Sequence, residues 1–202
     1  MKQGAMFVLG LTGPSGAGKS LAAKRLAELG YAVVDADRVA RQVMAPGSEC
    51  LRELRGAFGT MVIAADGSLD RQALARIAFG DPEALQRLDA LTHPPIVAAI
   101  AARLRELEET GCRRAVLDAP ALYESGADRL CDRVAAVVAS PQIRLARILR
   151  RDGIPRERAA ARIAAQPPRA YYTDRADFVI DSDAGTAHLL AETDRLARLW
   201  GA

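Results

Sequence analysis

The sequence predicts an α/β protein, in which a parallel sheet carries helices on its faces. Three observations lead to this prediction: short apolar runs, helical patterns between them, and turn residues or carboxylates directly after each run. A continuous run such as residues 6–11 (MFVLGL) is typical of a strand buried on both faces, as in parallel sheets. Alternation of this kind over 202 residues predicts a single domain spanning residues 1–202.

The first unit of this fold is a strand, a glycine-rich turn, a helix and a second strand. Leucines at helical spacing mark residues 20–29 as the helix, and Gly30 follows as its stop signal. Residues 32–34 form the second apolar run, which ends on Asp35-Ala-Asp37. A strand, a crossover helix and a parallel strand in this order form the basic unit of an α/β fold.

Three further apolar runs, at residues 115–117, 133–139 and 178–180, complete a predicted sheet of five parallel strands. Two arginine-rich helices are expected at residues 142–151 and 156–165. An amphipathic helix is expected to close the chain.

The long stretch between the second and third strands, residues 38–111, is predicted to be mostly helical. Asp81 and Pro82 form a helix-start signal, with proline at the first helical position. We expect His93-Pro94-Pro95 to interrupt the helical pattern, which resumes at residue 96, because proline lacks the backbone N–H that a helix interior uses.

Composition excludes several classes of protein. The net charge of +3 is mildly basic and suits either an anionic substrate or a solvated surface, and aromatic residues make up only 4%. Without a recognised binding motif, these values argue against a nucleic-acid partner. Cys50, Cys112 and Cys131 are far apart and lack metal-ligand spacing, so we expect reduced thiols and a cytoplasmic location. The apolar run at residues 5–11 is too short for a membrane span, so we expect no membrane partner, and we expect a monomer.

The strongest motif is Gly13-Pro-Ser-Gly-Ala-Gly-Lys-Ser20, which fits the G-x-x-x-x-G-K-[ST] pattern between a predicted strand and a predicted helix. Such a loop points backbone N–H groups at phosphate oxygens, and the following helix adds its positive end. Lys19 is expected to reach the β- and γ-phosphates, and Ser20 to ligate Mg²⁺. The motif predicts a P-loop NTPase that binds ATP·Mg²⁺ through Gly13, Ser15, Gly16, Ala17, Gly18, Lys19, Ser20 and Leu21.

Carboxylates follow the strands, and parallel strands collect ligands at their carboxyl ends. Asp37 is the candidate catalytic residue, because transfer of a phosphate to a hydroxyl uses a carboxylate to accept or orient the proton. Asp35 is expected to organise the turn or cap the next helix. Asp118 is interpreted either as a Mg²⁺ ligand acting through water or as a turn residue.

Arginines crowd the predicted hairpin of residues 142–165, where a mobile lid would stabilise the charge of phosphoryl transfer. For most of them a solvated face is the better interpretation. The evidence for a functional histidine is weaker, since a lone histidine such as His93 is more often structural than catalytic.

These motifs together resemble the bacterial dephospho-CoA kinase family over about residues 8–181. The resemblance rests on the following segments, in chain order: Gly10-Leu-Thr-Gly13, Val34-Asp-Ala-Asp37, Ala40-Arg-Gln-Val43, Asp66-Gly67-Ser-Leu-Asp-Arg71, Leu91-Thr-His-Pro94, Pro120-Ala-Leu-Tyr-Glu124, Arg144-Leu-Ala-Arg147, Gln166 and Ala176-Asp177-Phe-Val-Ile-Asp181. The loop alone is shared by many kinases, whereas this combined order is far more specific.

The resemblance implies transfer of phosphate from ATP to the ribose 3′-hydroxyl of 3′-dephospho-CoA, giving ADP and coenzyme A. By position, Asp37 matches the general base, and Thr12 and Lys19 match residues near the transferring phosphate. Arg147 matches a lid arginine that contacts ATP phosphates. The positions that match the acceptor region are Arg41, His93, Tyr123 and Glu124.

The resemblance also implies a fold similar to nucleoside monophosphate kinases. The parallel core would comprise residues 6–37, 112–141 and 176–202, with a helical acceptor-binding region at 38–111 and an arginine-rich lid at 142–170. Two departures from the family pattern stand out. Leu21 replaces a usual Thr after the Lys-Ser pair, and Ser182 replaces an Asn that would help to hold adenine.

Three alternatives remain from the residues alone. One is another P-loop kinase acting on a nucleoside or nucleotide. The second is a GTP-dependent switch, against which the lack of an Asn-Lys-x-Asp segment argues. The third is a nucleic-acid-binding module that uses the arginine-rich hairpin.

Overall fold

The computed structural model describes residues 6–78 and 80–200. Five parallel strands form one sheet in the order β2-β3-β1-β4-β5. The strands are β1 (Phe7–Thr12), β2 (Ala32–Asp35), β3 (Arg114–Asp118), β4 (Arg133–Val138) and β5 (Phe178–Asp181). All five predicted strands are confirmed, with ends that differ from the expected ones by a residue or so.

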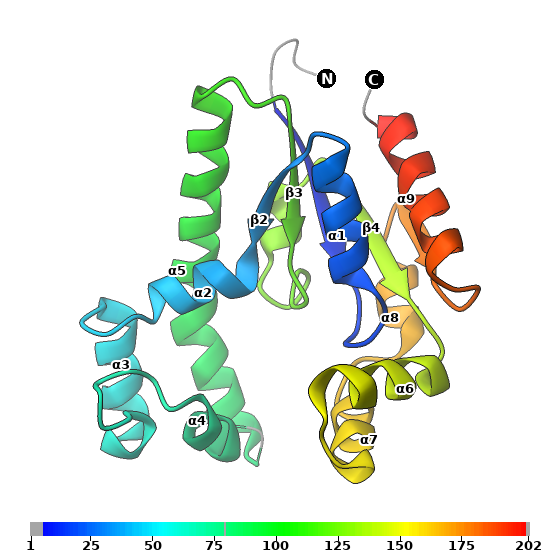
Figure 1. The fold of residues 1–202 in the computed structure, drawn as a ribbon. Coiled ribbons are helices and arrows are strands. Elements are labelled where there is room, and N and C mark those ends of the chain that lie inside the picture. Colours follow the sequence, from blue (N-terminus) through cyan, green and yellow to red (C-terminus); the bar gives the residue numbers. More distant parts are fainter. Residues whose placement is uncertain (1–5, 79, 201–202) are drawn as a thin grey trace.

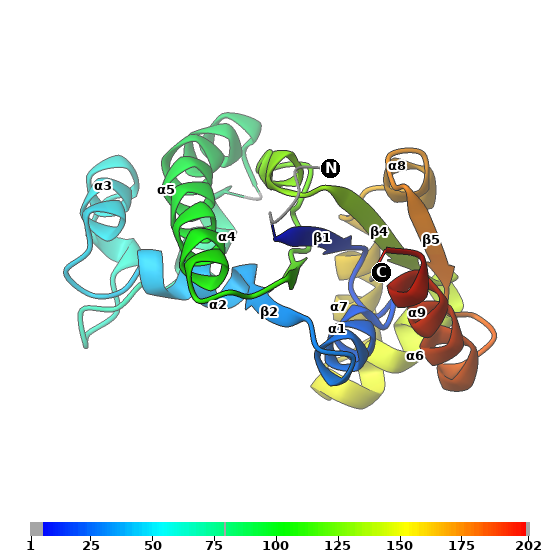
Figure 2. The same ribbon diagram turned by 90° about the horizontal axis from the view of Figure 1, so that it is seen from above.

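Helices cover both faces of the sheet, so that the molecule has three layers (Figures 1 and 2). Helices α1 (Lys19–Glu28) and α9 (Thr186–Trp200) cover one face, and α5 (Pro82–Glu109) and α8 (Arg169–Thr173) cover the other. The remaining helices are α2 (Ala36–Val43), α3 (Glu49–Phe58), α4 (Arg71–Ala78), α6 (Pro141–Asp152) and α7 (Arg156–Ala164), with short 3-10 turns at Thr60–Val62 and Ala127–Leu130.

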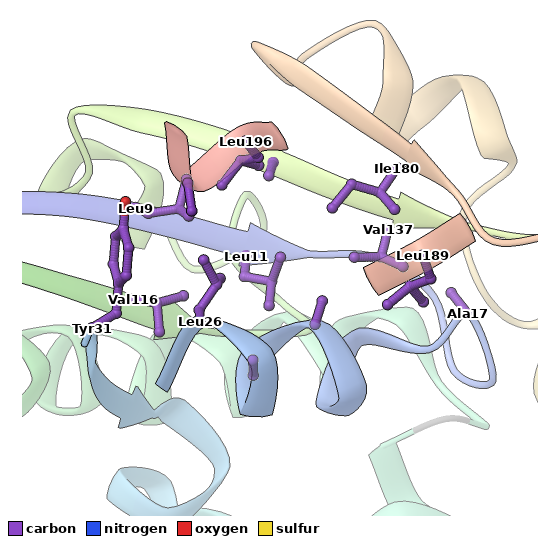
Figure 3. Close-up of a cluster of buried hydrophobic side chains, with 14 residues drawn as sticks. Leu9, Leu11, Ala17, Leu26, Tyr31, Val116, Val137, Ile180, Leu189 and Leu196 are labelled. Carbon is purple, nitrogen blue, oxygen red and sulfur yellow. The ribbon is translucent and has the colours of Figure 1, made fainter. Parts of the chain in front are cut away.

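The core under α1 and α9 also anchors the glycine-rich loop. Leu9 and Leu11 of β1 pack against Leu26 of α1 and Leu189 of α9 (Figure 3). Ala17, within the loop, is fully buried in the same cluster. Each buried leucine contributes about 1.5–3 kcal/mol, so the loop is anchored by Ala17 to a well-buried part of the core.

Helix α5 runs without interruption through Pro94 and Pro95, so the predicted break at His93-Pro94-Pro95 is wrong. Pro95 cannot donate to the carbonyl of Leu91, four residues earlier. The Cys50 thiol of α3 donates to that carbonyl instead, with Sγ 3.7 Å from the oxygen. Packing of α2, α3 and α4 against α5 supports the rest of the helix. Tertiary contacts therefore overcome the local preference of the two prolines.

Two helical segments extend beyond the carboxyl ends of the strands. Helices α3 and α4 lie beside the N-terminal half of α5, at the lower left of Figure 1. Helices α6 and α7 lie below β4, at the lower right. No helix in residues 6–78 and 80–200 combines the length and apolar character that a membrane span needs.

Candidate active site

The glycine-rich loop connects β1 to α1 and presses directly on β4. Gly13 adopts a φ of 140°, and a Cβ there would stand 2.0 Å from the Val137 carbonyl oxygen. Only glycine is compatible with that backbone and that approach. Gly18 then forms the left-handed N-cap of α1. The loop lines a cavity of about 520 Å³, together with Lys19, Ser20, Leu21 and Arg147.

Lys19, which lines this cavity, forms an ion pair with Asp118. The Lys19 Nζ lies 2.8 Å from Asp118 Oδ1, and the two side chains are only 13% and 17% exposed. Asp118 ends β3 and pairs in register with Leu11 of β1, which brings it beside the start of the loop. A basic and an acidic group are thus held together where phosphates would enter.

Arg147 of α6 reaches the back of the loop. Its guanidinium donates to the carbonyl oxygens of Gly16 at 3.2 Å and Ala17 at 3.1 Å, and to the hydroxyl of Ser182 at 2.7 Å. Ser182 is fully buried, and its hydroxyl donates to the Ala17 carbonyl at 2.6 Å. From the sequence, Ser182 was expected only to lose a contact with adenine. Its place behind the loop follows from packing and has no local signal.

A second cavity, of about 310 Å³, adjoins the first. Apolar side chains of α2, α4 and α5 form most of its wall, and its polar lining residues are Asp37, Arg71, Asp89, Thr92, His93 and Ser125. Asp37 lies in the first turn of α2, and Asp37 and Pro120 line both cavities. Asp35 accepts from the Arg38 N–H at 3.0 Å, so the expectation that it caps a helix is confirmed.

The other acceptor candidates occupy different environments. His93 lines the second cavity, with its Nε2 3.4 Å from Asp89 Oδ1 one turn earlier in α5. Thr12 is fully buried and donates to the Pro120 carbonyl at 3.2 Å, which holds the segment shared by the two cavities. Arg41 and Glu124 are exposed, and neither lines the two cavities as the described residues form them.

Tyr123 packs against the core cluster between α5 and the sheet, and it lines neither of the two cavities as the described residues form them. Its ring meets Tyr171 edge to face with centroids 6.0 Å apart, and burial raises the pKa of Tyr123 to about 12. Its hydroxyl is buried and has no hydrogen-bond partner among the described residues. This side chain therefore supports the loop after β3 by packing.

A phosphate cradle, a carboxylate and an apolar pocket side by side suit transfer of a phosphoryl group to the hydroxyl of a small molecule. The fold and this site together define a P-loop kinase that acts on small molecules. A sequence model of the dephospho-CoA kinase family matches residues 7–188. The chain belongs to the dephospho-CoA kinase family, and it is a transferase that phosphorylates dephospho-CoA with ATP in coenzyme A biosynthesis.

Individual relatives agree with this assignment. The chain is 46% identical to the dephospho-CoA kinase of Streptomyces avermitilis over 180 residues, covering 88% of this chain and 86% of that one. It is 43% identical to that of Aromatoleum aromaticum over 191 residues, covering 94% and 92%. The structure of dephospho-CoA kinase from Campylobacter jejuni superposes with a TM-score of 0.68 at 25% identity, covering 95% of each chain.

Proposed function

We propose that ATP occupies the cavity around the glycine-rich loop and that dephospho-CoA presents its ribose 3′-hydroxyl from the neighbouring cavity. The observation that carries this proposal is that Asp37 and Pro120 line both cavities. A hydroxyl in the apolar cavity would meet the γ-phosphate at the boundary between them. Proximity of the two reactants at such a boundary supplies a large part of the rate acceleration in group transfer.

Asp37 accepts or orients the proton of the attacking hydroxyl. Support comes from its exposed carboxylate at the start of α2, which faces the shared boundary. A general base must lie within hydrogen-bond reach of the proton that it takes, and no other carboxylate lines both cavities as the described residues form them.

The phosphates of ATP are held by the loop and two cations. The loop residues Ser15, Gly16, Ala17, Gly18 and Leu21 surround the phosphates, as expected for a loop that opens onto a helix N-terminus. Lys19 contacts the β- and γ-phosphates, which requires its ammonium to turn from Asp118. Arg147 lies in the wall of the same cavity, where its charge stabilises the phosphates during transfer.

Mg²⁺ accompanies ATP in this proposal and neutralises charge between the β- and γ-phosphates when it is bound. The residues present fit this ion: Ser20 offers an exposed hydroxyl in the cavity wall, and Asp118, beside Lys19, offers a carboxylate that would act through water. Mg²⁺ bound with a nucleotide keeps several waters and needs few protein ligands. The hard oxygen chemistry of both groups is what Mg²⁺ prefers.

On the acceptor side, His93 and the apolar wall of the second cavity hold dephospho-CoA. Thr12 acts near the transferring phosphate by holding Pro120 in place. Arg41, Tyr123 and Glu124 belong to the surroundings of this region, and their exposed or packed positions suit contacts made on closure. Residues 38–111 then form the acceptor-binding region, residues 142–170 the lid, and residues 6–37, 112–141 and 176–202 the core of one domain.

The decisive experiment is a coupled ADP-release assay with dephospho-CoA and, in parallel, nucleosides and nucleoside monophosphates as acceptors. Turnover with dephospho-CoA and with none of the other acceptors supports the proposal. Turnover confined to a nucleoside or nucleotide would replace it with the other kinase activity. We also propose a monomeric, cytoplasmic enzyme, in keeping with the free thiols of Cys50, Cys112 and Cys131, and light scattering of the purified chain tests the monomer.

A further inference from the structure

Both backbone polar groups of Ser15, the third residue of the loop, are held by side chains from the lid. The Arg144 Nε donates to the Ser15 carbonyl oxygen at 2.9 Å. The Ser15 N–H donates to Gln166 Oε1 at 3.1 Å. The Arg144 Nη2 donates to the same Gln166 oxygen and closes a ring of three hydrogen bonds. The three residues are far apart in the chain, so the ring exists only in the folded lid.

Arg144 is buried, and its charge is not balanced by a carboxylate. It is 6% exposed, although the sequence pattern favoured a solvated face for most arginines of this hairpin. No ion pair among the described residues includes Arg144, and burial lowers the pKa of its guanidinium. A buried cation held only by neutral acceptors is costly for stability, which points to a role in function.

The backbones of the loop and α6 touch beside this ring. Gly16 has a φ of 81°, and a Cβ there would lie 2.8 Å from the carbonyl oxygen of Arg144. Such an approach leaves no room for a side chain between the loop and the helix. The start of α6 and the loop are therefore in contact through backbone as well as through the Arg144 fork.

A loop that turns N–H groups toward phosphates turns carbonyl groups away from them, and those carbonyls need donors elsewhere. Arg144 supplies one to Ser15, as Arg147 does to Gly16 and Ala17. The planar guanidinium meets two acceptors in a fixed geometry, which a lysine ammonium cannot reproduce. Gln166, a neutral acceptor in the cavity wall, completes the ring without placing a negative charge near the phosphates.

We propose that Arg144 is a positioning residue for ATP: together with Gln166 it holds the Ser15 backbone so that the loop is preorganised for the phosphates. The inference rests on the proposed function only in taking the loop as the ATP site. It assigns no contact between Arg144 and substrate. It predicts that breaking the ring weakens ATP binding while the acceptor site is unaffected.

The test compares Arg144→Lys, Gln166→Ala and the double variant with the wild type, and uses Arg158→Gln on the exposed face of α7 as the matched control. ATP affinity is measured by calorimetry, the KM for dephospho-CoA by ADP release, and folding by thermal unfolding. Each single variant is expected to lose about tenfold in ATP affinity, the worth of one charge-assisted hydrogen bond. The KM for dephospho-CoA should stay within about twofold. Because either change breaks the same ring, the double variant should lose little more than a single one.

Wild-type ATP affinity in Arg144→Lys would show that charge alone suffices and would overturn the proposal. Equal weakening of the binding of ATP and of dephospho-CoA would also overturn it. So would a loss of ATP affinity in the double variant that equals the product of the two single losses. If Arg144→Lys fails to fold, Gln166→Ala decides by the same criteria. A wild-type chain that binds ATP but does not phosphorylate dephospho-CoA would refute the proposed function, and the affinities would still decide the role of Arg144.

Discussion

The ammonium of Lys19 lies 2.8 Å from the carboxylate of Asp118, where the loop after β1 meets the end of β3. The pair is largely shielded from water, so each charge depends on the other. Phosphates that draw Lys19 away would leave the Asp118 carboxylate free to hold the hydration shell of a metal ion. In the proposed ATP complex, the pair would thus link binding of the nucleotide to binding of its metal.

Lys19→Ala is expected to lower kcat/KM for ATP by about 10²–10³-fold, since it removes a cation that faces the charge of transfer. Steady-state ADP release over a range of ATP concentrations measures this loss. Lys24→Ala, on the exposed side of the same helix, is the matched control and should behave as the wild type. A Lys19→Ala enzyme with ordinary ATP kinetics would remove Lys19 from the site.

Asp37→Asn is expected to lower kcat by about 10²–10⁴-fold, the usual contribution of a general base, while ATP affinity remains. Single-turnover kinetics and calorimetry separate the two effects. Asp35→Asn is a close control, because asparagine caps a helix as well as aspartate does and Asp35 serves as the cap of α2. Near-normal turnover in Asp37→Asn would exclude Asp37 as base or orienting group.

His93→Gln is expected to raise the KM for dephospho-CoA by about tenfold, as one lost polar contact would. The KM for ATP should not change, because His93 lines only the second of the two cavities. His188→Gln, at an exposed position of α9, controls for loss of a histidine. An effect of His93→Gln on ATP alone would contradict the proposed acceptor site.

Arg147→Ala is expected to lower turnover more than it weakens binding of dephospho-CoA, because its guanidinium lies behind the loop and in the wall of the ATP cavity. Ser182→Ala is the companion variant. It removes a buried hydroxyl that donates to the Ala17 carbonyl and accepts from the Arg147 guanidinium, and loss of these two hydrogen bonds should cost about 1–3 kcal/mol in the free energy of unfolding. Urea denaturation measures that change. A larger effect of Arg147→Ala on acceptor binding would move Arg147 out of the transfer site.

Asp152 should make the hairpin of α6 and α7 sensitive to acid. Hydrogen bonds from Arg151 and Arg162 lower the pKa of Asp152 to about 2, and the one from Arg162 joins α7 to α6. Because the folded pKa lies below the unfolded value of about 3.9, this stabilisation is present above pH 4. It is lost as the pH falls through about 2. The protection of α7 amides against hydrogen exchange, relative to the unfolded chain, is measured between pH 2 and 5 to test this loss. In Asp152→Asn that protection should not change over this pH range for this reason.

Local patterns were enough for the sheet and for the phosphate loop. A buried strand, a run of glycines and a helix start are encoded within a few residues of one another, so residues 6–29 could be interpreted directly. The order of motifs from Asp37 to Asp181 then indicated the family, and the matches over residues 7–188 confirmed it.

The fold class, the phosphate loop and the family therefore follow from the sequence alone, because each depends on short-range periodicity or on contiguous motifs. Tertiary structure decided what distant residues do together. Cys50 of α3 replaces the donor that Pro95 lacks, Ser182 supports the loop from behind, and Arg144 meets Ser15 across 129 residues. Which side chains meet over such separations depends on how helices pack on the sheet, and no local pattern encodes that packing.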